Sequence, residues 1–222
     1  LHLSLRRQRQ MCIRDRAIRS YRYGPAAAKV DFALDGPIPW ANAEVGQSPT
    51  VHIGGSAAEI WESENAVARG RISDRPYVLS VQPSVFDPSR APEGKAVLWA
   101  YIHVPQGSDL DATELVTRQV ERFAPGFRDL ILAHHSVPAS SREAINPSEI
   151  GGDILGGAFT IPQALRRPVL GTAPWRTPMR GVYLASASTP PGPGVNGMAG
   201  WHAARTALKD AGARVSLGDL FG

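Results

Sequence analysis

Short stretches that are apolar throughout, or in which apolar and polar residues alternate as in residues 29–34, run through the first two thirds of the chain. Alternation predicts a half-buried β-strand, because successive side chains of a strand point to opposite faces of a sheet, and a short apolar run between turn residues also predicts a strand. The predicted strands cover residues 29–34, 50–53, 77–81, 96–104 and 130–137. Since the strands follow one another without strict alternation with helices, we expect an α+β fold. Its sheet is mixed and largely antiparallel, with helices on one face.

Two stretches carry the signal of a capping box, in which a Ser or Asp is followed three residues later by Glu. The two boxes are Ser56 with Glu59 and Asp111 with Glu114. We expect the first helix to run to about Gly70 and the second to end at Pro125. For residues 138–180 the pattern predicts mostly loop, with a short helix at 162–166.

A third pattern, near the carboxyl end, is the most informative part of the chain. Residues 181–185 form an apolar run that predicts a buried strand, a loop of small residues with Pro and Gly follows, and a helical pattern begins near Met198. Glycines let a backbone approach a ligand closely, and a helix start offers unpaired N–H groups and a partial positive charge. The combination is typical of a site for a flat or anionic ligand.

The loop contains a literal match to the dinucleotide-binding pattern G-x-G-x-x-G, at residues 192–197, with Asp219 about 20 residues further on. That fingerprint requires its first Gly at the end of the strand. Here residues 188–191 intervene, and Pro193 stiffens the turn. We therefore reject the interpretation of this stretch as the opening of a Rossmann fold.

Residues 184–200 taken together resemble the C-terminal flavin motif of the phytoene desaturase-like FAD-dependent oxidoreductases. The resemblance is strongest to the branch of pyridine nucleotide-disulfide oxidoreductase domain-containing proteins. Upstream segments resemble the same branch in the same order; they are residues 30–37, 82–95, 121–127, 151–157 and 167–168. These segments are specific for the family when taken together, although no single one of them is. The resemblance extends over residues 26–210.

The resemblance implies a division of the chain into three parts. Residues 17–150 correspond to a substrate-domain portion, and residues 151–222 to the strand–loop–helix that returns to a split, Rossmann-like (α/β) FAD-binding domain. The dinucleotide fingerprint of that family lies upstream of everything seen here, so we expect a C-terminal portion of a longer enzyme. Residues 1–16 are expected to be a non-native tail, since residues 10–16 look like translated sequencing-adapter sequence.

The resemblance also implies a function and a set of cofactor-binding residues. The family members use FAD to transfer hydrogen or hydride from apolar or conjugated substrates. Carried over to this sequence, the residues expected at the FAD are Gly156, Gly157, Ala187, Ser188, Gly192, Gly194, Val195, Asn196, Gly197 and Met198. Ala187 and Ser188 would lie near the ribityl chain and the pyrophosphate, and the N–H groups of residues 195–198 would face the pyrimidine end of the isoalloxazine. Gly156 and Gly157 would pack closely beside the flavin.

Some details of the site stay open. Family members often carry Gly in place of Pro193 and His in place of Asn196, which leaves the individual contacts undetermined. No catalytic acid or base can be assigned. A second hypothesis is a non-catalytic carrier of prenyl groups or lipids, because the Rab GDP-dissociation inhibitors share this architecture. Their flavin loop is degenerate, whereas the glycines of residues 192–200 are present here, which favours the enzyme.

The distribution of charge along the chain argues against a nucleic-acid partner. The chain has 222 residues and a net charge of +4, but residues 1–22 contain seven Arg and one acidic residue. The other 200 residues carry 17 basic and 19 acidic side chains, so the excess of basic charge belongs to the amino-terminal segment and no nucleic-acid partner is expected. We expect a small apolar substrate and a cytoplasmic location, and peripheral association with a membrane is left open, as is the oligomeric state.

The cysteine and most of the histidines are interpreted as structural residues and not as metal ligands. Cys12 is the only cysteine, so neither a disulfide nor a cysteine metal cluster is expected. His134 and His135 are adjacent on a predicted strand and face opposite ways, which disfavours a shared metal ion. His202 could face the cofactor, but we expect it to pack or cap within the last helix. On the longest strand, Trp99 and Tyr101 could line a substrate tunnel as well as pack.

Overall fold

The computed structural model describes residues 15–213, which divide into two compact units. The first, here called the sheet unit, is Pro25–Ile154. The second, here called the loop unit, combines residues 15–24 with residues 155–213. Most of the adapter-like segment, Cys12 and the acidic residue at position 219 lie outside the described residues.

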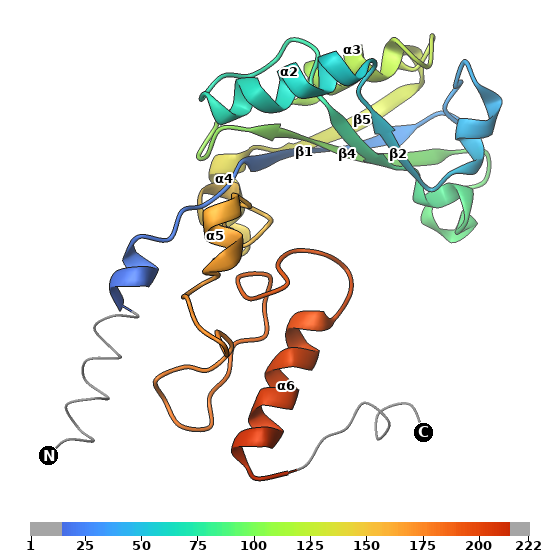
Figure 1. The fold of residues 1–222 in the computed structure, drawn as a ribbon. Coiled ribbons are helices and arrows are strands. Elements are labelled where there is room, and N and C mark those ends of the chain that lie inside the picture. The colour runs from blue at the N-terminus through green and yellow to red at the C-terminus, as the bar shows by residue number, and fades with distance from the viewer. Residues whose placement is uncertain (1–14, 214–222) are drawn as a thin grey trace, which may run out of the picture. The chain divides into compact units, whose positions relative to one another are not determined.

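The sheet unit is built on five strands whose order in the sheet is β2-β3-β4-β1-β5 (Figure 1). They are β1 (Ala26–Leu34), β2 (Thr50–Ile53), β3 (Val78–Val81), β4 (Ala96–Val104) and β5 (Ile131–Val137). Every neighbouring pair is antiparallel. The predicted α+β fold is thus confirmed at a coarse level, and the sheet contains no parallel pair among the described strands.

Helices α2 (Ala57–Ala68) and α3 (Thr113–Glu121) lie over one face of this sheet, as predicted (Figure 1). The first capping box is confirmed, because the Ser56 hydroxyl accepts from the Glu59 N–H at 3.3 Å while the Glu59 carboxylate accepts from the Ser56 N–H at 2.9 Å.

The second capping box is wrong, because the N-cap residue of α3 is Ala112, which makes no side-chain cap, and Asp111 lies one residue before it. Asp111 does accept from the N–H of Thr113 at 2.9 Å, but the Glu114 carboxylate binds the guanidinium of Arg128, with both oxygens engaged at 2.8 and 3.0 Å. A bidentate pair with Arg is stronger than a bond to a backbone N–H, which explains the exchange of partners. The helix also ends at Glu121, before Pro125.

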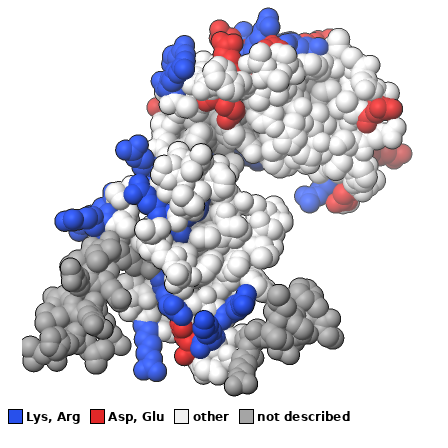
Figure 2. All heavy atoms as spheres, viewed as in Figure 1, with Lys and Arg blue, Asp and Glu red and all other residues white. Residues whose placement is uncertain are grey.

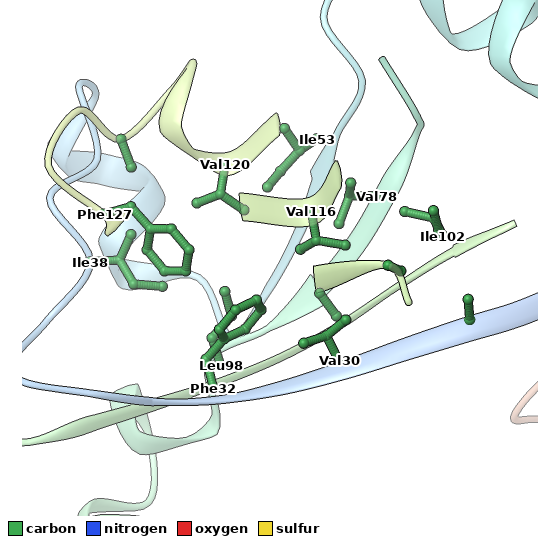
Figure 3. Close-up of a cluster of buried hydrophobic side chains, with 14 of the residues drawn as sticks. Val30, Phe32, Ile38, Ile53, Val78, Leu98, Ile102, Val116, Val120 and Phe127 are labelled. Carbon is green, nitrogen blue, oxygen red and sulfur yellow. The ribbon is translucent and has the colours of Figure 1, made fainter. Parts of the chain in front are cut away.

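The hydrophobic core fills the space between the helices and the sheet (Figure 3). Strands β1 and β4 contribute every second side chain, and α3 contributes Val116 and Val120. At the centre the rings of Phe32 and Phe127 meet edge to face, with their centroids 5.5 Å apart. The intervening residues of β1 and β4, Trp99 among them, lie on the opposite face, which the core does not cover.

The remaining helices are short, except for the last one. Helix α4 (Ala139–Ile145) was not predicted, because Ser140 and Ser141 lower its helix propensity and it buries only Ala139. Helices α5 (Ile161–Leu165) and α6 (Met198–Asp210) confirm the predictions for those segments. In the residues that the structure describes, no helix has the length and apolar character needed to cross a bilayer.

The predicted buried strand at residues 181–185 is wrong. Its ladder is reduced to one isolated bridge between Tyr183 and Arg176, and the N–H of Leu184 donates to the carbonyl of Trp175 at 2.7 Å. Val182 is 43% exposed. An apolar run forms a stable strand only when neighbouring strands bond to it. Within the described part of the loop unit, residues 181–185 pair only with the segment around Arg176.

Candidate functional site

The carboxyl-terminal helix begins with an exposed and sparsely capped turn. Gly197 is the N-cap residue, with φ at +64° in the left-handed region that Gly adopts without strain. The Asn196 side chain accepts from the N–H of Met198 at 2.9 Å, and the first regular helical bond runs from Trp201 N to Gly197 O. The N–H groups of Ala199 and Gly200 precede that bond, so this end of a 13-residue helix favours an acceptor or a negative charge.

The loop before the helix has two halves of different character. The first half is anchored: Thr189 is buried and its N–H donates to Ser186 O at 2.9 Å, and Gly192 N donates to Thr189 O at 2.8 Å. The second half, residues 194–198, is exposed, and Val195 is fully so. The predicted residues Gly194, Val195, Asn196, Gly197 and Met198 therefore form one accessible main-chain arc that leads into α6.

The predicted glycines Gly156 and Gly157 lie beside the first half of this loop. A Cβ atom on Gly156 would be 3.0 Å from the Ser188 hydroxyl, and one on Gly157 would be 2.2 Å from the Tyr21 hydroxyl. Both hydroxyls donate to the Gly156 carbonyl, at 2.9 and 2.7 Å. The structure thus brings Gly156 and Gly157 to Ala187 and Ser188, and the space beside the glycines holds protein atoms.

A buried arginine, which the sequence did not single out as functional, holds these segments together. Arg167 is only 1% exposed, and its guanidinium donates to four backbone carbonyls. The acceptors are Leu155 at 2.6 Å, Ala187 at 2.7 Å, and Gly157 and Ala158 at 3.3 Å. A planar fork with five N–H donors suits such a cluster of acceptors. The only signal in the sequence is an Arg-Pro pair within a loop, and no spacing reveals that its charge is buried.

Aromatic rings fasten the anchored half of the loop to α6. The indole N–H of Trp175 donates to the Pro190 carbonyl at 3.0 Å, and its ring stacks on His202 with the centroids 4.8 Å apart. The expectation that His202 packs is confirmed. Because His202 lies one turn into the helix, this contact fixes the direction in which the exposed turn points.

The far end of α6 is fixed by charge. Both carboxylate oxygens of Asp210 accept from Arg176, at 2.5 and 2.7 Å, and one also accepts from the Tyr183 hydroxyl at 3.0 Å. The hydrogen bonds from Arg176 lower the pKa of Asp210, while partial burial and the carboxylate of Asp210 raise the pKa of Tyr183. At neutral pH this contact is therefore an ion pair with a protonated phenol beside it.

In the sheet unit, the uncovered face of the sheet forms a shallow cavity of about 440 Å³. Asp31, Trp99 and His135 contribute to its lining, and the Trp99 ring stacks on Tyr101 with the centroids 6.2 Å apart. Burial raises the pKa of Tyr101, so its hydroxyl stays protonated at neutral pH. Among the described residues no cluster of three or more metal-ligating side chains occurs, and His134 and His135 are mostly exposed.

The chemistry of the exposed arc is that of binding and orientation. Between Ser186 and Met198 the side chains are small, apolar or amide, and none of them can ionise in the physiological range. What the arc presents is main-chain N–H groups at a positive helix end. Such a site can hold a flat group with acceptor atoms and stabilise negative charge on it, but it cannot itself transfer a proton.

Comparison with known proteins finds similarity to proteins whose names describe oxidoreductases. Two proteins named pyridine nucleotide-disulfide oxidoreductase domain-containing protein 2, from Mus musculus and Rattus norvegicus, are each 31% identical over 153 residues, which is 64% of this chain and 26% of the relative. A 4,4'-diapolycopen-4-al dehydrogenase from Metabacillus indicus is 31% identical over 145 residues, covering 62% of this chain and 27% of the relative. No family model matches the chain. The chain spans about a quarter of the length of these relatives, and the resemblance inferred from the sequence is confirmed at this coarse level.

Proposed function

We propose that the chain is part of an FAD-dependent oxidoreductase and that the loop unit supplies the main-chain groups that face the flavin. The observation that carries this proposal is the exposed arc of residues 194–198, which ends in a helix start without a side-chain cap from its N-cap residue. The relatives named as oxidoreductase and dehydrogenase support the same class of reaction. When bound, a flavin accepts a hydride or its equivalent from the substrate.

The residues present fit an isoalloxazine. Its pyrimidine end carries acceptor atoms and gains negative charge on reduction, and the first-turn N–H groups of α6 are donors at the positive end of a helix dipole. We assign Val195, Asn196, Gly197 and Met198 to that end of the ring. Ala187 and Ser188 remain our candidates for the ribityl and pyrophosphate region, with Gly192 and Gly194 shaping the loop between them. Gly156 and Gly157 act as the support on which this loop rests.

We place an apolar or conjugated substrate on the uncovered face of the sheet. The cavity there has ring and aliphatic side chains, among them Val97 and Trp99. Its volume of about 440 Å³ falls within the range of small-molecule sites. A charged substrate would have to compete with the ion pair between Lys29 and Asp31, whose atoms are 2.7 Å apart on this face.

The flavin assignment can be tested on the chain itself by following its backbone amides during a titration with FAD. We expect saturable shifts confined to residues 187–188 and 194–200, even where the affinity is weak. The substitution Gly197→Ala strains the left-handed N-cap and should weaken the response several-fold, because an L side chain rarely adopts this φ.

A matched control lies at the other end of the same helix. Gly212 also has a positive φ, +83°, and open space around it, so Gly212→Ala introduces the same type of strain away from the arc. Shifts that respond equally to both substitutions, or that fall outside the arc, contradict the proposal. The enzyme and carrier hypotheses can be separated on a protein as long as the relatives. A flavin absorption band at ~450 nm would support the enzyme, and its absence would support the carrier.

A further inference from the structure

The sheet unit contains a second cavity, which we call the β2 pocket, at the edge of the sheet formed by β2. It has a volume of about 470 Å³, within the range of small-molecule sites. The large apolar side chains of its lining are Trp40, Val45, Val51, Ile53, Ile60 and Phe123. These side chains come from β2, from the loop before it, from α2 and from the turn after α3. Three consecutive segments, the loop before β2, β2 itself and α2, therefore meet the distant turn after α3 around one space.

In one wall of the β2 pocket, Gly54 allows the backbone to lie against the side chains of Ile60 and Tyr77. A Cβ atom on Gly54 would lie 2.3 Å from Cγ1 of Ile60 and 3.2 Å from the ring of Tyr77. Any side chain at this position would push Ile60 or Tyr77 from its place. The close approach of β2 to α2, and with it the shape of the pocket, depends on this residue.

One polar pair interrupts the apolar lining. His52 Nδ1 lies within hydrogen-bond distance of the Tyr77 hydroxyl. Partial burial and the nearby carboxylate of Glu64 raise the pKa of Tyr77, so the phenol keeps its proton at neutral pH. If the phenol donates to Nδ1, the Nε2–H of His52 is left over; if Nδ1–H donates to the phenol oxygen, the O–H of Tyr77 is left over. In either tautomer the pair keeps one donor that it does not use itself.

The charged groups next to the pocket are engaged with one another. The Glu59 carboxylate adjoins Gly55 in the pocket wall and accepts from Arg122 at 2.8 Å and from Arg75 at 3.2 Å. Acidic and basic side chains are likewise mixed over the surface of the sheet unit in Figure 2. A ligand with a charge of its own would lose hydration among apolar walls, and these charged side chains already have partners of opposite sign.

We propose that the β2 pocket binds a neutral, largely apolar small molecule with one carbonyl oxygen, which accepts a hydrogen bond from the His52–Tyr77 pair. Its residues all belong to the sheet unit, and the proposal does not depend on the flavin assignment. The apolar walls provide the affinity, and the polar pair selects a carbonyl group over a plain hydrocarbon.

Three probes of nearly equal size test the proposal on the full chain without flavin. They are cyclohexyl methyl ketone, isopropylcyclohexane and cyclohexanecarboxylate. We expect saturable shifts of the amides of residues 51–55 with the ketone, binding about tenfold weaker with the hydrocarbon, the equivalent of one hydrogen bond, and weaker binding still with the carboxylate. Equal affinity for ketone and hydrocarbon, or tighter binding of the carboxylate, overturns the proposal.

Two sets of variants locate the site. Val51→Trp fills the pocket from β2 and should abolish binding of the ketone, whereas Thr50→Trp, at the exposed neighbouring position that does not line the pocket, should leave it unchanged. The double substitution His52→Phe with Tyr77→Phe keeps the rings but removes the donors, so the tenfold preference for the ketone should vanish. Equal binding by the two Trp variants would show that the ketone binds elsewhere. A preference that survives the double substitution would show that the His52–Tyr77 pair does not donate to the ketone.

Discussion

In the sheet unit the side chains withdrawn from solvent are mainly hydrocarbon, whereas in the described part of the loop unit the largest of them is the guanidinium of Arg167. Phe32, Phe127 and Leu98 are typical of the first interior. In the second, the buried polar side chains are Gln163, Arg167 and Thr189, and Ala203 is the buried hydrophobic one. One interior is held by burial of apolar surface, and the other by hydrogen bonds to backbone carbonyls.

The difference has a functional consequence. Apolar burial is non-directional and produces a compact layer, as the sheet and its helices show. Hydrogen bonds from a planar guanidinium to several carbonyls are directional, and they fix the loop segments that carry those carbonyls in one arrangement. Gln163 acts in the same way as Arg167: its amide donates to the carbonyls of Arg22 and Ala158 at 2.7 and 2.9 Å. A loop that must present bare backbone to a ligand benefits from the second kind of interior.

The largest expected effect comes from a cavity in the apolar interior. Phe32→Ala removes a ring that is 2% exposed and packs against Phe127, and it should lower the free energy of unfolding of the sheet unit by about 3–5 kcal/mol. Urea unfolding followed by circular dichroism measures this loss. Leu132→Ala, at an exposed position of β5, serves as the control and should change it by no more than about 0.5 kcal/mol. Similar losses for the two variants would contradict the proposed role of the core.

A smaller, local effect is expected from the polar interior. Arg167→Ala leaves four carbonyls without their donor, and we expect the segments 155–158 and 187–188 to open more easily by about 2–4 kcal/mol. Hydrogen exchange of the amides in the loop unit measures this change. The sheet unit should keep its exchange rates.

Two further variants sharpen the test of Arg167. Arg166→Ala changes the exposed neighbour and should leave exchange in these segments unaltered. Arg167→Lys keeps the charge but lacks the planar fork, so it should restore only part of the protection. Full rescue by Lys would mean that charge, and not the geometry of the guanidinium, holds the loops.

The two interiors also differ in how far they could be predicted from sequence. Short apolar or alternating stretches located all five strands of the sheet unit, and the Ser56–Glu59 box located the start of α2, because in both cases the signal is local. The same reasoning failed at residues 181–185, where an apolar run lacks a neighbouring ladder. It also missed the burial of Arg167, whose four acceptors come from segments up to 20 residues away. The turn that contains the glycines of the arc was predicted because turn chemistry is local, whereas the buried arginine that supports it was not.

The smallest expected effect comes from the hydrogen bonds to Glu59 at the surface of the sheet unit. It shows whether such bonds contribute to stability there as they do around Arg167. The Ser56 N–H, Arg122 and Arg75 all bind the Glu59 carboxylate, and these contacts lower its pKa from an ordinary value of 4.5 to about 2. Because the folded-state pKa is the lower one, the stabilisation is complete above about pH 4.5 and is lost as the pH falls towards 2.

Glu59→Gln keeps the shape of the side chain but removes its charge, so the difference in unfolding free energy between the native chain and this variant isolates the contribution of Glu59. We expect that difference to be constant between pH 7 and 5 and to shrink steadily between pH 4.5 and 2 in chemical denaturation series. It should remain smaller than the local loss caused by Arg167→Ala, because solvent screens the exposed partners of Glu59 but not the buried guanidinium. A difference that stays constant down to pH 2 would mean that the carboxylate is not preferentially ionised in the folded state. The contrast between the two units would then rest on burial alone and not on how their charged groups are hydrogen-bonded.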